Sequence, residues 1–311
     1  MEYVKDLISV VIPTYRRSDM LTRAIDSVLG QTYANVECIV VNDNIVGDEH
    51  SQVLYENLKV YENDPRFRFL EQEKHINGAA ARNVGIRAAK GEYIAFLDDD
   101  DYWEKEKLQL QVDWLKAHDE TWGAVSCLSR RYYNGELAFA GMPYPTGNIL
   151  MDILCRRMGL GTGAVLMRRT ALDNAGYFDE SLMRHQDLQV FACLAAKYKI
   201  GLVKKYLFNI EARDAQNRPT VEKLQKIKSD YFTSIRDIMD SLTPAQRKRV
   251  HIMHDFECAY AFYRNGRKKE GLLMAFGVFR SPVTLYLAAV RMIRRIGAKR
   301  LRKYLNKKYS A

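Results

Sequence analysis

Short apolar runs alternate with longer segments whose apolar residues recur at helical spacing along the first two hundred residues. The runs have the length and the Val and Ile content of buried strands, and the segments between them have the three- and four-residue spacing of amphipathic helices. Strands that alternate with helices form right-handed crossovers, so the pattern predicts an α/β protein with a mostly parallel central sheet flanked by helices. We expect strands over residues 7–13, 36–41, 67–70, 93–97, 122–128 and 164–167, and helices over residues 18–29, 50–63, 77–89, 104–118 and 187–197.

The pattern becomes helical throughout from about residue 221. Thr243 and Pro244 have the chemistry of a helix start, a capping hydroxyl followed by a first-turn proline. No continuous run of 18 apolar residues occurs, so we expect no membrane-spanning helix. The sequence therefore predicts an α/β domain over residues 1–215 and a helical C-terminal region over residues 216–311.

Polar side chains follow three of the expected strands directly. They are Thr14 with Tyr15, Asn42 with Asp43, and the four carboxylates of residues 98–101. Parallel sheets bind their ligands at the carboxyl ends of the strands, so these groups should share one rim. Carboxylates at such a rim suit a hard divalent cation such as Mg²⁺ or Mn²⁺. The alternative is a solvated loop whose acids cap the next helix, and the Asp-x-Asp spacing does not separate the two.

Five segments in one order resemble family 2 glycosyltransferases of the GT-A fold. This resemblance implies transfer of a sugar from a nucleoside diphosphate donor with inversion at the anomeric carbon. It extends over roughly residues 7–200, about two thirds of the chain. The segments are residues 8–15 (ISVVIPTY), 38–43 (CIVVND), 77–86 (NGAAARNVGI), 91–103 (GEYIAFLDDDDYW), and 175–180 (AGYFDE) followed by Gln186 and Asp187.

The resemblance also implies roles for individual residues. The metal motif of the family falls on Asp98 and Asp100, which would hold Mn²⁺ or Mg²⁺. The catalytic base falls on Asp187, and the aspartate that holds the nucleotide base falls on Asp43. The residues implied for nucleotide-sugar binding are Pro13, Thr14, Tyr15, Asp43, Arg82, Asp98 and Asp99.

These roles agree with the chemistry of the reaction. A sugar hydroxyl is a poor nucleophile near neutral pH, so a carboxylate must accept its proton as the new bond forms. The departing nucleoside diphosphate gains negative charge, which a cation can offset. In-line displacement needs the base and the leaving group on opposite faces of the sugar, and Asp187 is far enough along the chain from the metal motif to provide the second wall.

Each role has a structural alternative. Asp43 lies in an Asn-Asp-Asn turn, Arg82 can be a solvated helix residue, and Asp187 can cap the helix that follows it. Two positions also depart from the family pattern: relatives often have aspartate at Asn42, and they commonly have arginine at Cys193. The histidine of residue 185 is expected at the rim, near the acceptor or the diphosphate.

Charge is concentrated at the C-terminus. The formal net charge is +10, and residues 271–311 contain ten Lys or Arg and no acid, so the remainder is formally neutral. Residues 283–308 have the pattern of a basic amphipathic helix, which predicts binding to an anionic membrane surface. The alternative is a helix that packs its apolar face on the domain. A nucleic-acid partner is not expected, because no aromatic-rich recognition motif accompanies the basic run.

The remaining composition indicates a cytoplasmic protein, and the basic amphipathic segment 283–308 predicts that it is peripheral on the inner face of the cell membrane. No secretory leader precedes the first strand, and five cysteines without C-x-x-C spacing indicate reduced, structural thiols. We expect a metal-dependent glycosyltransferase that uses a UDP-sugar and a glycan or lipid-linked acceptor in surface polysaccharide synthesis. The rival interpretations are a metal-dependent phosphohydrolase and a non-catalytic, membrane-associated protein that binds nucleotide sugars.

Overall fold

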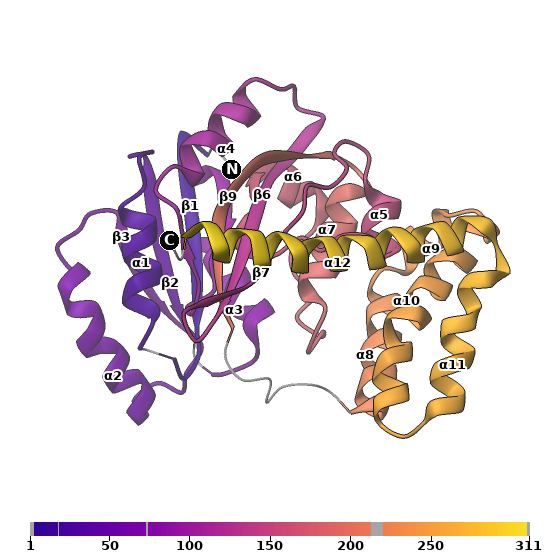
Figure 1. Ribbon diagram of the computed structural model, residues 1–311. Helices are drawn as coiled ribbons and strands as arrows, with labels where there is room; N and C mark the ends of the chain where they lie inside the picture. The colour runs from indigo at the N-terminus through magenta and orange to yellow at the C-terminus, as the bar shows by residue number, and fades with distance from the viewer. Residues whose placement is uncertain (1–2, 18, 73, 213–219, 310–311) are drawn as a thin grey trace.

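The computed structural model describes residues 3–17, 19–72, 74–212 and 220–309, with the side chains of a few further helical residues, including 298–309, outside that description. Its centre is a nine-stranded sheet in the order β3-β2-β1-β4-β8-β6-β9-β5, with β7 paired to β6 (Figure 1). The strands are β1 (Val4–Thr14), β2 (Val36–Asn42), β3 (Phe67–Glu71), β4 (Gly91–Phe96), β5 (Tyr102–Trp103), β6 (Trp122–Tyr133), β7 (Glu136–Ala140), β8 (Leu166–Arg168) and β9 (Lys199–Ala212).

The prediction of a mostly parallel sheet is confirmed. Strands β1 to β4 pair in parallel, and β6 and β9 run in the same direction as they do. The short strands β5, β7 and β8 run in the opposite direction. The antiparallel β8 lies between β4 and β6 and extends the sheet beyond its parallel half, so the second half of the chain can build a wall beside the strand ends of the first.

Helices cover both faces of the sheet. Alternate residues of the strands enter two separate cores: Ile8, Val10 and Ile12 belong to one, and Val11 to the other. This two-residue alternation is what a sheet covered on both faces requires. The helices of this part are α1 (Leu21–Leu29), α2 (Glu49–Leu58), α3 (Gly78–Ala88), α4 (Lys107–Lys116), α5 (Leu150–Leu154), α6 (Arg169–Ala175) and α7 (Gln186–Ala195).

The C-terminal region is helical, as predicted, and returns across the sheet. Helices α8, α10 and α11 lie together at one end of the molecule, and α12 runs from there across β6 and β7 (Figure 1). Gly297 permits a close approach, because a Cβ at this position would lie 2.6 Å from Sδ of Met142. The helices are α8 (Val221–Ser234), α9 (Arg236–Ser241), α10 (Pro244–Arg264), α11 (Lys268–Phe276) and α12 (Pro282–Tyr309).

Two expectations about this region can be compared with the structure. Within the described residues, no single helix is both long and apolar enough to cross a membrane, although 268–280 and 282–293 meet the criterion jointly across a bend of 117°. The predicted domain boundary near residue 215 lies outside the described residues. Strand β9 was not predicted, because the exposed Lys204 and Lys205 interrupt its apolar pattern.

Candidate functional site

A cavity of about 440 Å³ opens at the carboxyl ends of β1, β2 and β4. We call it the acidic cavity. It brings together every residue that the sequence predicted for nucleotide-sugar and metal binding. It is lined by Pro13, Thr14, Tyr15, Arg16, Arg17, Asp43, His75, Gly78, Arg82, Asp98, Asp99 and Asp100.

Asp43 lies at one end of the acidic cavity and is almost completely buried. Its Oδ1 accepts hydrogen bonds from Nε2 of Gln72 (2.7 Å) and from the backbone N–H of Ile76 (3.2 Å), and its Oδ2 lies 3.0 Å from Nδ1 of His75. Burial raises the pKa of Asp43, and these partners oppose the rise. The His75 ring stacks on Tyr15 with centroids 3.9 Å apart. Asp43 is therefore held in place by its surroundings, beside a flat aromatic surface.

Asn42 explains the departure from the family pattern at the end of β2. Its side-chain carbonyl accepts a hydrogen bond from the backbone N–H of Asn44 (3.0 Å), and its amide donates to Oγ of Ser51 (3.1 Å). The neutral amide shapes the turn and leaves Asp43 as the carboxylate of the segment 42–44.

The acids after β4 take different environments. Asp98 is the most exposed and accepts a hydrogen bond from Nη2 of Arg82, while Asp100 forms an ion pair with Arg17. Asp99 is buried and accepts a hydrogen bond from Oγ1 of Thr14 (2.9 Å). Burial, reinforced by Asp100, raises the pKa of Asp99 to about 7. Asp98, Asp99 and Asp100 thus all line the acidic cavity, although Asp99 is the most buried of the three.

Asp101, the fourth acid, is also buried. It accepts a hydrogen bond from the backbone N–H of Glu211 in β9 (3.0 Å). Burial, together with Asp98 and Asp100, raises its pKa to about 9. Asp101 therefore joins the acidic loop to β9 and lines the Asp187 cavity, not the acidic cavity.

Asp98 and Asp100 could contribute to a metal site, but they do not form a complete one. In the part of the chain that the structure describes, no group of three or more His, Cys, Asp or Glu side chains is arranged to hold a metal ion. A Mg²⁺ or Mn²⁺ ion commonly uses one or two carboxylates and completes its shell with waters and phosphate oxygens. The carboxylates of Asp98 and Asp100 fit such a shared site.

Arg82 connects the acidic cavity with a second cavity of about 300 Å³ that contains Asp187. Its helix, α3, approaches β1 closely at Gly85, where a Cβ would lie 2.3 Å from a methyl group of Val11. Arg82 donates to the carbonyl of Gly78 (3.1 Å) and to Asp98, and it lines both cavities, as Asp98 does. The Asp187 cavity, lined also by Arg131, Thr162, His185 and Phe208, is therefore continuous with the acidic loop.

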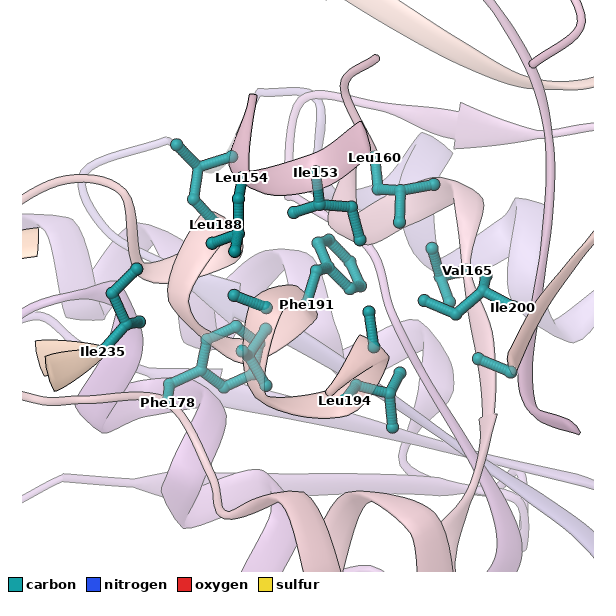
Figure 2. Packing of buried hydrophobic residues seen from close by; sticks show 14 of the residues in the cluster. Ile153, Leu154, Leu160, Val165, Phe178, Leu188, Phe191, Leu194, Ile200 and Ile235 are labelled. Atoms are coloured by element: carbon teal, nitrogen blue, oxygen red, sulfur yellow. The ribbon is translucent and has the colours of Figure 1, made fainter. Parts of the chain in front are cut away.

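Asp187 lies in the first turn of α7, one residue after the helix begins at Gln186, and the rest of that helix is anchored in the core. Figure 2 shows three residues of α7, Leu188, Phe191 and Leu194, in a hydrophobic cluster. Their neighbours in the cluster include Ile153 of α5, Ile200 of β9 and Ile235, which caps α9. Burial raises the pKa of Asp187, and Arg156 is the main charge that opposes the rise. A carboxylate in this setting is a stronger base than an ordinary aspartate.

A third cavity, of about 520 Å³, adjoins Asp187 on the side of the C-terminal helices. We call it the arginine cavity, because Arg131, Arg156, Arg157 and Arg291 line it together with Asp187. Arg156 has a left-handed backbone (φ 55°), a conformation that costs a non-glycine residue about 1–2 kcal/mol. The sequence did not predict these arginines, which come from an irregular segment, a strand end and α12.

Glu257 of α10 holds the arginine cavity together from behind. Its carboxylate accepts hydrogen bonds from Arg156 (3.2 Å), Lys228 (2.8 Å) and Arg291 (3.0 Å). The pKa of Glu257 lies far below its usual value because these cations outweigh the effect of burial. One carboxylate thus joins α8, α10, α12 and the segment after α5.

The structure also shows the surroundings of two histidines and a cysteine in this region, namely His185, His254 and Cys193. His185 is half buried beside Asp187, its ring facing Tyr231 at 5.8 Å, and burial lowers its pKa to about 3, so it lines the Asp187 cavity as a neutral group. His254 is buried between Nζ of Lys228 (3.1 Å) and the carbonyl of Leu154 (3.0 Å), as a structural residue. Cys193 accepts a weak hydrogen bond from Gln189. Arg156, from another segment, supplies the positive charge near Asp187.

Sequence comparisons find known proteins similar to this chain. An uncharacterized glycosyltransferase of Rickettsia felis is 28% identical over 210 residues, covering 68% of this chain but 34% of that protein, so the chain spans about a third of its length. The UDP-Glc:alpha-D-GlcNAc-diphosphoundecaprenol beta-1,3-glucosyltransferase WfgD of Escherichia coli is 25% identical over 271 residues, covering 84% of this chain and 98% of that protein.

Solved structures share the fold and confirm the GT-A architecture. TarS 1-349 of S. aureus in complex with UDP-GlcNAc has a TM-score of 0.62 at 19% identity, covering 94% of this chain and 90% of that chain. The mannosyltransferase PcManGT of Pyrobaculum calidifontis, in complex with GDP-Man and Mn²⁺, has a TM-score of 0.58 at 17% identity, covering 97% and 87%. The model of the family "Glycosyl transferase family 2" matches residues 9–180, more than half of the chain, and this protein therefore belongs to that family.

Proposed function

We propose that this protein is an inverting glycosyltransferase that moves a sugar from a nucleoside diphosphate to a glycan or lipid-linked acceptor during surface polysaccharide synthesis. The observation that carries the proposal is that Arg82 and Asp98 line both the acidic cavity and the cavity of Asp187. A sugar held between these cavities would have its leaving group near the acidic loop and a carboxylate base near its other side. Residues 1–215 would form the catalytic domain, and residues 216–311 would complete the acceptor side.

The reaction is a single displacement. The acceptor hydroxyl oxygen forms a bond to the anomeric carbon while the bond from that carbon to the diphosphate oxygen breaks, and the electron pair leaves with the nucleoside diphosphate. Asp187 accepts the hydroxyl proton, a role for which its raised pKa is suited. Arg82 donates hydrogen bonds at the junction of the two cavities, where the diphosphate charge would develop.

The nucleotide would lie at the Asp43 end of the acidic cavity. Asp43 offers carboxylate oxygens to N–H groups of a base, and the stacked pair of Tyr15 and His75 offers an aromatic surface to the base or ribose. We propose a UDP-sugar as donor. The E. coli relative named above uses UDP-Glc by its name, and the S. aureus structure holds UDP-GlcNAc, which supports this choice.

A divalent cation, Mn²⁺ or Mg²⁺, would be held by Asp98 and Asp100. When bound, it would neutralise charge on the diphosphate as the bond to the sugar breaks. Arg17 and Arg82, which now pair with these two carboxylates, are near enough to the same wall to share the phosphate oxygens. The Mn²⁺ complex of the Pyrobaculum structure supports the metal assignment.

A membrane location would suit a lipid-linked acceptor. Helix α12 buries Thr284, Leu287 and Ala288, so part of the expected alternative, packing on the protein, is present. Other apolar residues of the same region remain exposed, and residues 271–311 contain no acid. Basic and apolar groups together favour an anionic bilayer, so we propose that the enzyme is peripheral on the inner face of the cell membrane.

The proposal is tested by incubating the purified chain with a panel of UDP- and GDP-sugars and Mn²⁺, with and without a chelator, and following nucleotide release and sugar transfer to membrane lipid extracts. We expect one nucleotide sugar to raise the melting temperature and to be consumed only with the cation. Hydrolysis of phosphate monoesters without sugar transfer would support the phosphohydrolase instead. Donor binding without any transfer would support the non-catalytic binding protein.

A further inference from the structure

An apolar groove of about 410 Å³ lies between α10, α11 and α12. Its walls are almost entirely hydrocarbon and aromatic side chains, and several are about half exposed. They include Phe256, Tyr263, Leu272, Ala275, Met292 and Ile296. A groove of this volume is within the usual range for a small-molecule site, but its walls offer few polar groups to orient a polar ligand. It is suited to a hydrocarbon chain.

Arg291 lines both this apolar groove and the arginine cavity. Its Nη2 donates to Glu257 (3.0 Å), but its Nη1 is buried with no hydrogen-bond partner among the described residues. The Nε of Arg157, in the arginine cavity, is also buried without a partner there. A buried donor without an acceptor raises the free energy of the folded protein. A bound ligand with acceptor oxygens would satisfy these N–H groups.

The charges around the arginine cavity do not balance. Among the buried and half-buried residues of the arginine cavity and their ion-pair partners, four cations face three carboxylates, a surplus of one positive charge; the cations are Arg156, Arg157, Arg291 and Lys228, and the carboxylates are Asp152, Asp187 and Glu257. The exposed Arg131 adds a second surplus charge at the cavity wall. Buried charges normally require partners of opposite sign. A diphosphate diester carries one negative charge on each phosphate and would neutralise the surplus. Arginine also binds phosphate oxygens through paired N–H groups.

Exposed apolar side chains lie on the same helices as the groove and next to its lining residues in the sequence. Leu273, Phe276 and Phe279 in and after α11 are more than half exposed, as are Tyr286 and Ile293 of α12. A patch of this kind beside a groove is typical of an interaction surface. The part of a long lipid chain that extends beyond the groove would therefore find apolar side chains on the same two helices.

We propose that the arginine cavity binds the diphosphate of a lipid-diphosphate-linked sugar acceptor and that the apolar groove binds the first part of its lipid. The acceptor sugar would lie at Asp187, its diphosphate on Arg156, Arg157 and Arg291, and its hydrocarbon between α10, α11 and α12. This inference rests on the proposed function and specifies its acceptor class. The C-terminal helices are thus part of the acceptor site.

The lipid part is tested by binding measurements with farnesyl diphosphate, inorganic diphosphate and farnesol, in the presence of saturating UDP and Mn²⁺ to occupy the acidic cavity. Farnesyl diphosphate should bind more tightly than either of its parts. Leu272→Ser combined with Met292→Ser should weaken it about tenfold, because apolar contact is lost, and leave inorganic diphosphate unaffected. The matched control is Val60→Ser, at a 77% exposed apolar position far from the C-terminal helices in the sequence. It should leave the affinity for all three ligands unchanged.

The phosphate part is tested with Arg157→Gln, which should weaken farnesyl diphosphate and inorganic diphosphate by the same factor, about tenfold. Lys59→Gln, which removes a cation from an exposed ion pair, is the control. Circular dichroism and the melting temperature verify folding. If Leu272→Ser with Met292→Ser unfolds the chain, Met292→Ser alone, at a 54% exposed position, provides the lipid test.

Either of two binding results would overturn the inference. One is equal affinity for farnesyl diphosphate and inorganic diphosphate, and the other is a loss of farnesyl diphosphate binding that is the same in the groove variant and in Val60→Ser. Neither result affects the proposed function, which fails only when no nucleotide sugar is consumed with any acceptor. Sugar transfer that is indifferent to the length of the acceptor lipid would likewise overturn the inference while leaving the transferase activity intact.

Discussion

The acidic cavity and the arginine cavity are connected through the cavity of Asp187 but are built in different ways. The acidic cavity consists of groups that directly follow β1, β2 and β4, so the sheet itself places them. The arginine cavity brings together the end of β6, an irregular segment after α5, and α12, joined by the single carboxylate of Glu257. In the proposed reaction, the acidic cavity is the donor end of the site, and the arginine cavity is its acceptor end, or arginine end. Substitutions at one end should therefore have little effect on the other.

The largest effect is expected at the arginine end, for Glu257→Gln. The substitution leaves Arg156, Lys228 and Arg291 without their shared carboxylate, and breaking a buried ion pair typically costs about 3–5 kcal/mol. Urea unfolding at neutral pH measures this loss. Glu56→Gln, at an exposed ion pair, should cost at most about 1 kcal/mol. Donor binding should survive, because Glu257 does not line the acidic cavity.

The pH dependence of unfolding in the wild type and in Glu257→Gln shows whether Glu257 stabilises the fold as a carboxylate. Because the pKa of Glu257 is lowered by folding, its contribution to stability is fully present above its usual pKa of about 4.3 and is lost as the pH falls below that value. The stability gap between the wild type and Glu257→Gln should therefore shrink on acidification. A gap that widens at low pH would show that Glu257 is not the ionised centre of the cluster.

Asp98→Asn should reduce transfer by about 10²- to 10³-fold, the usual loss when one group that stabilises transition-state charge is removed. Asp98 lines both the acidic cavity and the Asp187 cavity, so this substitution affects the junction of the two ends. Stimulation by Mn²⁺ should decline with it. Asp113→Asn, on the exposed side of α4, is the control. Full Mn²⁺-dependent activity in Asp98→Asn would remove Asp98 from the metal site.

His75→Ala should have the smallest of these effects and act on the donor end alone. It removes the stack on Tyr15 and the partner of Asp43, and stacking on an aromatic ring contributes about 1–3 kcal/mol per base. We expect the donor KM to rise about tenfold with little change in kcat. His118→Ala removes a similar stack, on Trp114, outside these cavities and should leave the donor KM unchanged. Equal changes in the two variants would show a general loss of stability.

This difference also explains what the sequence could predict. The strands 7–13, 36–41 and 93–97 and the groups that follow them were predictable, because short Val- and Ile-rich runs define a parallel sheet and the sheet then fixes its rim. The resemblance added Asp187, whose position beside that rim no local pattern defines. The roles assigned to these residues stay predictions.

The missed residues share a physical cause. His75 lies in a connection with no periodicity, and its value comes from the stack on Tyr15, sixty residues earlier in the chain. Arg156 and Arg291 matter because Glu257 joins them across three helices and an irregular segment. Strand β9 was missed because its middle is exposed, although it carries Phe208 and Ile210 to the Asp187 cavity. Such contacts depend on tertiary packing.

The central claim, that Asp187 is the base between a donor end and an acceptor end, is tested most directly by comparing Asp187→Asn with the wild type in donor binding and in transfer. The amide preserves the shape of the side chain but cannot accept the proton. We expect unchanged nucleotide-sugar affinity with transfer lowered about 10²- to 10⁴-fold. Transfer that remains near the wild-type rate, or donor affinity lost together with transfer, would contradict it.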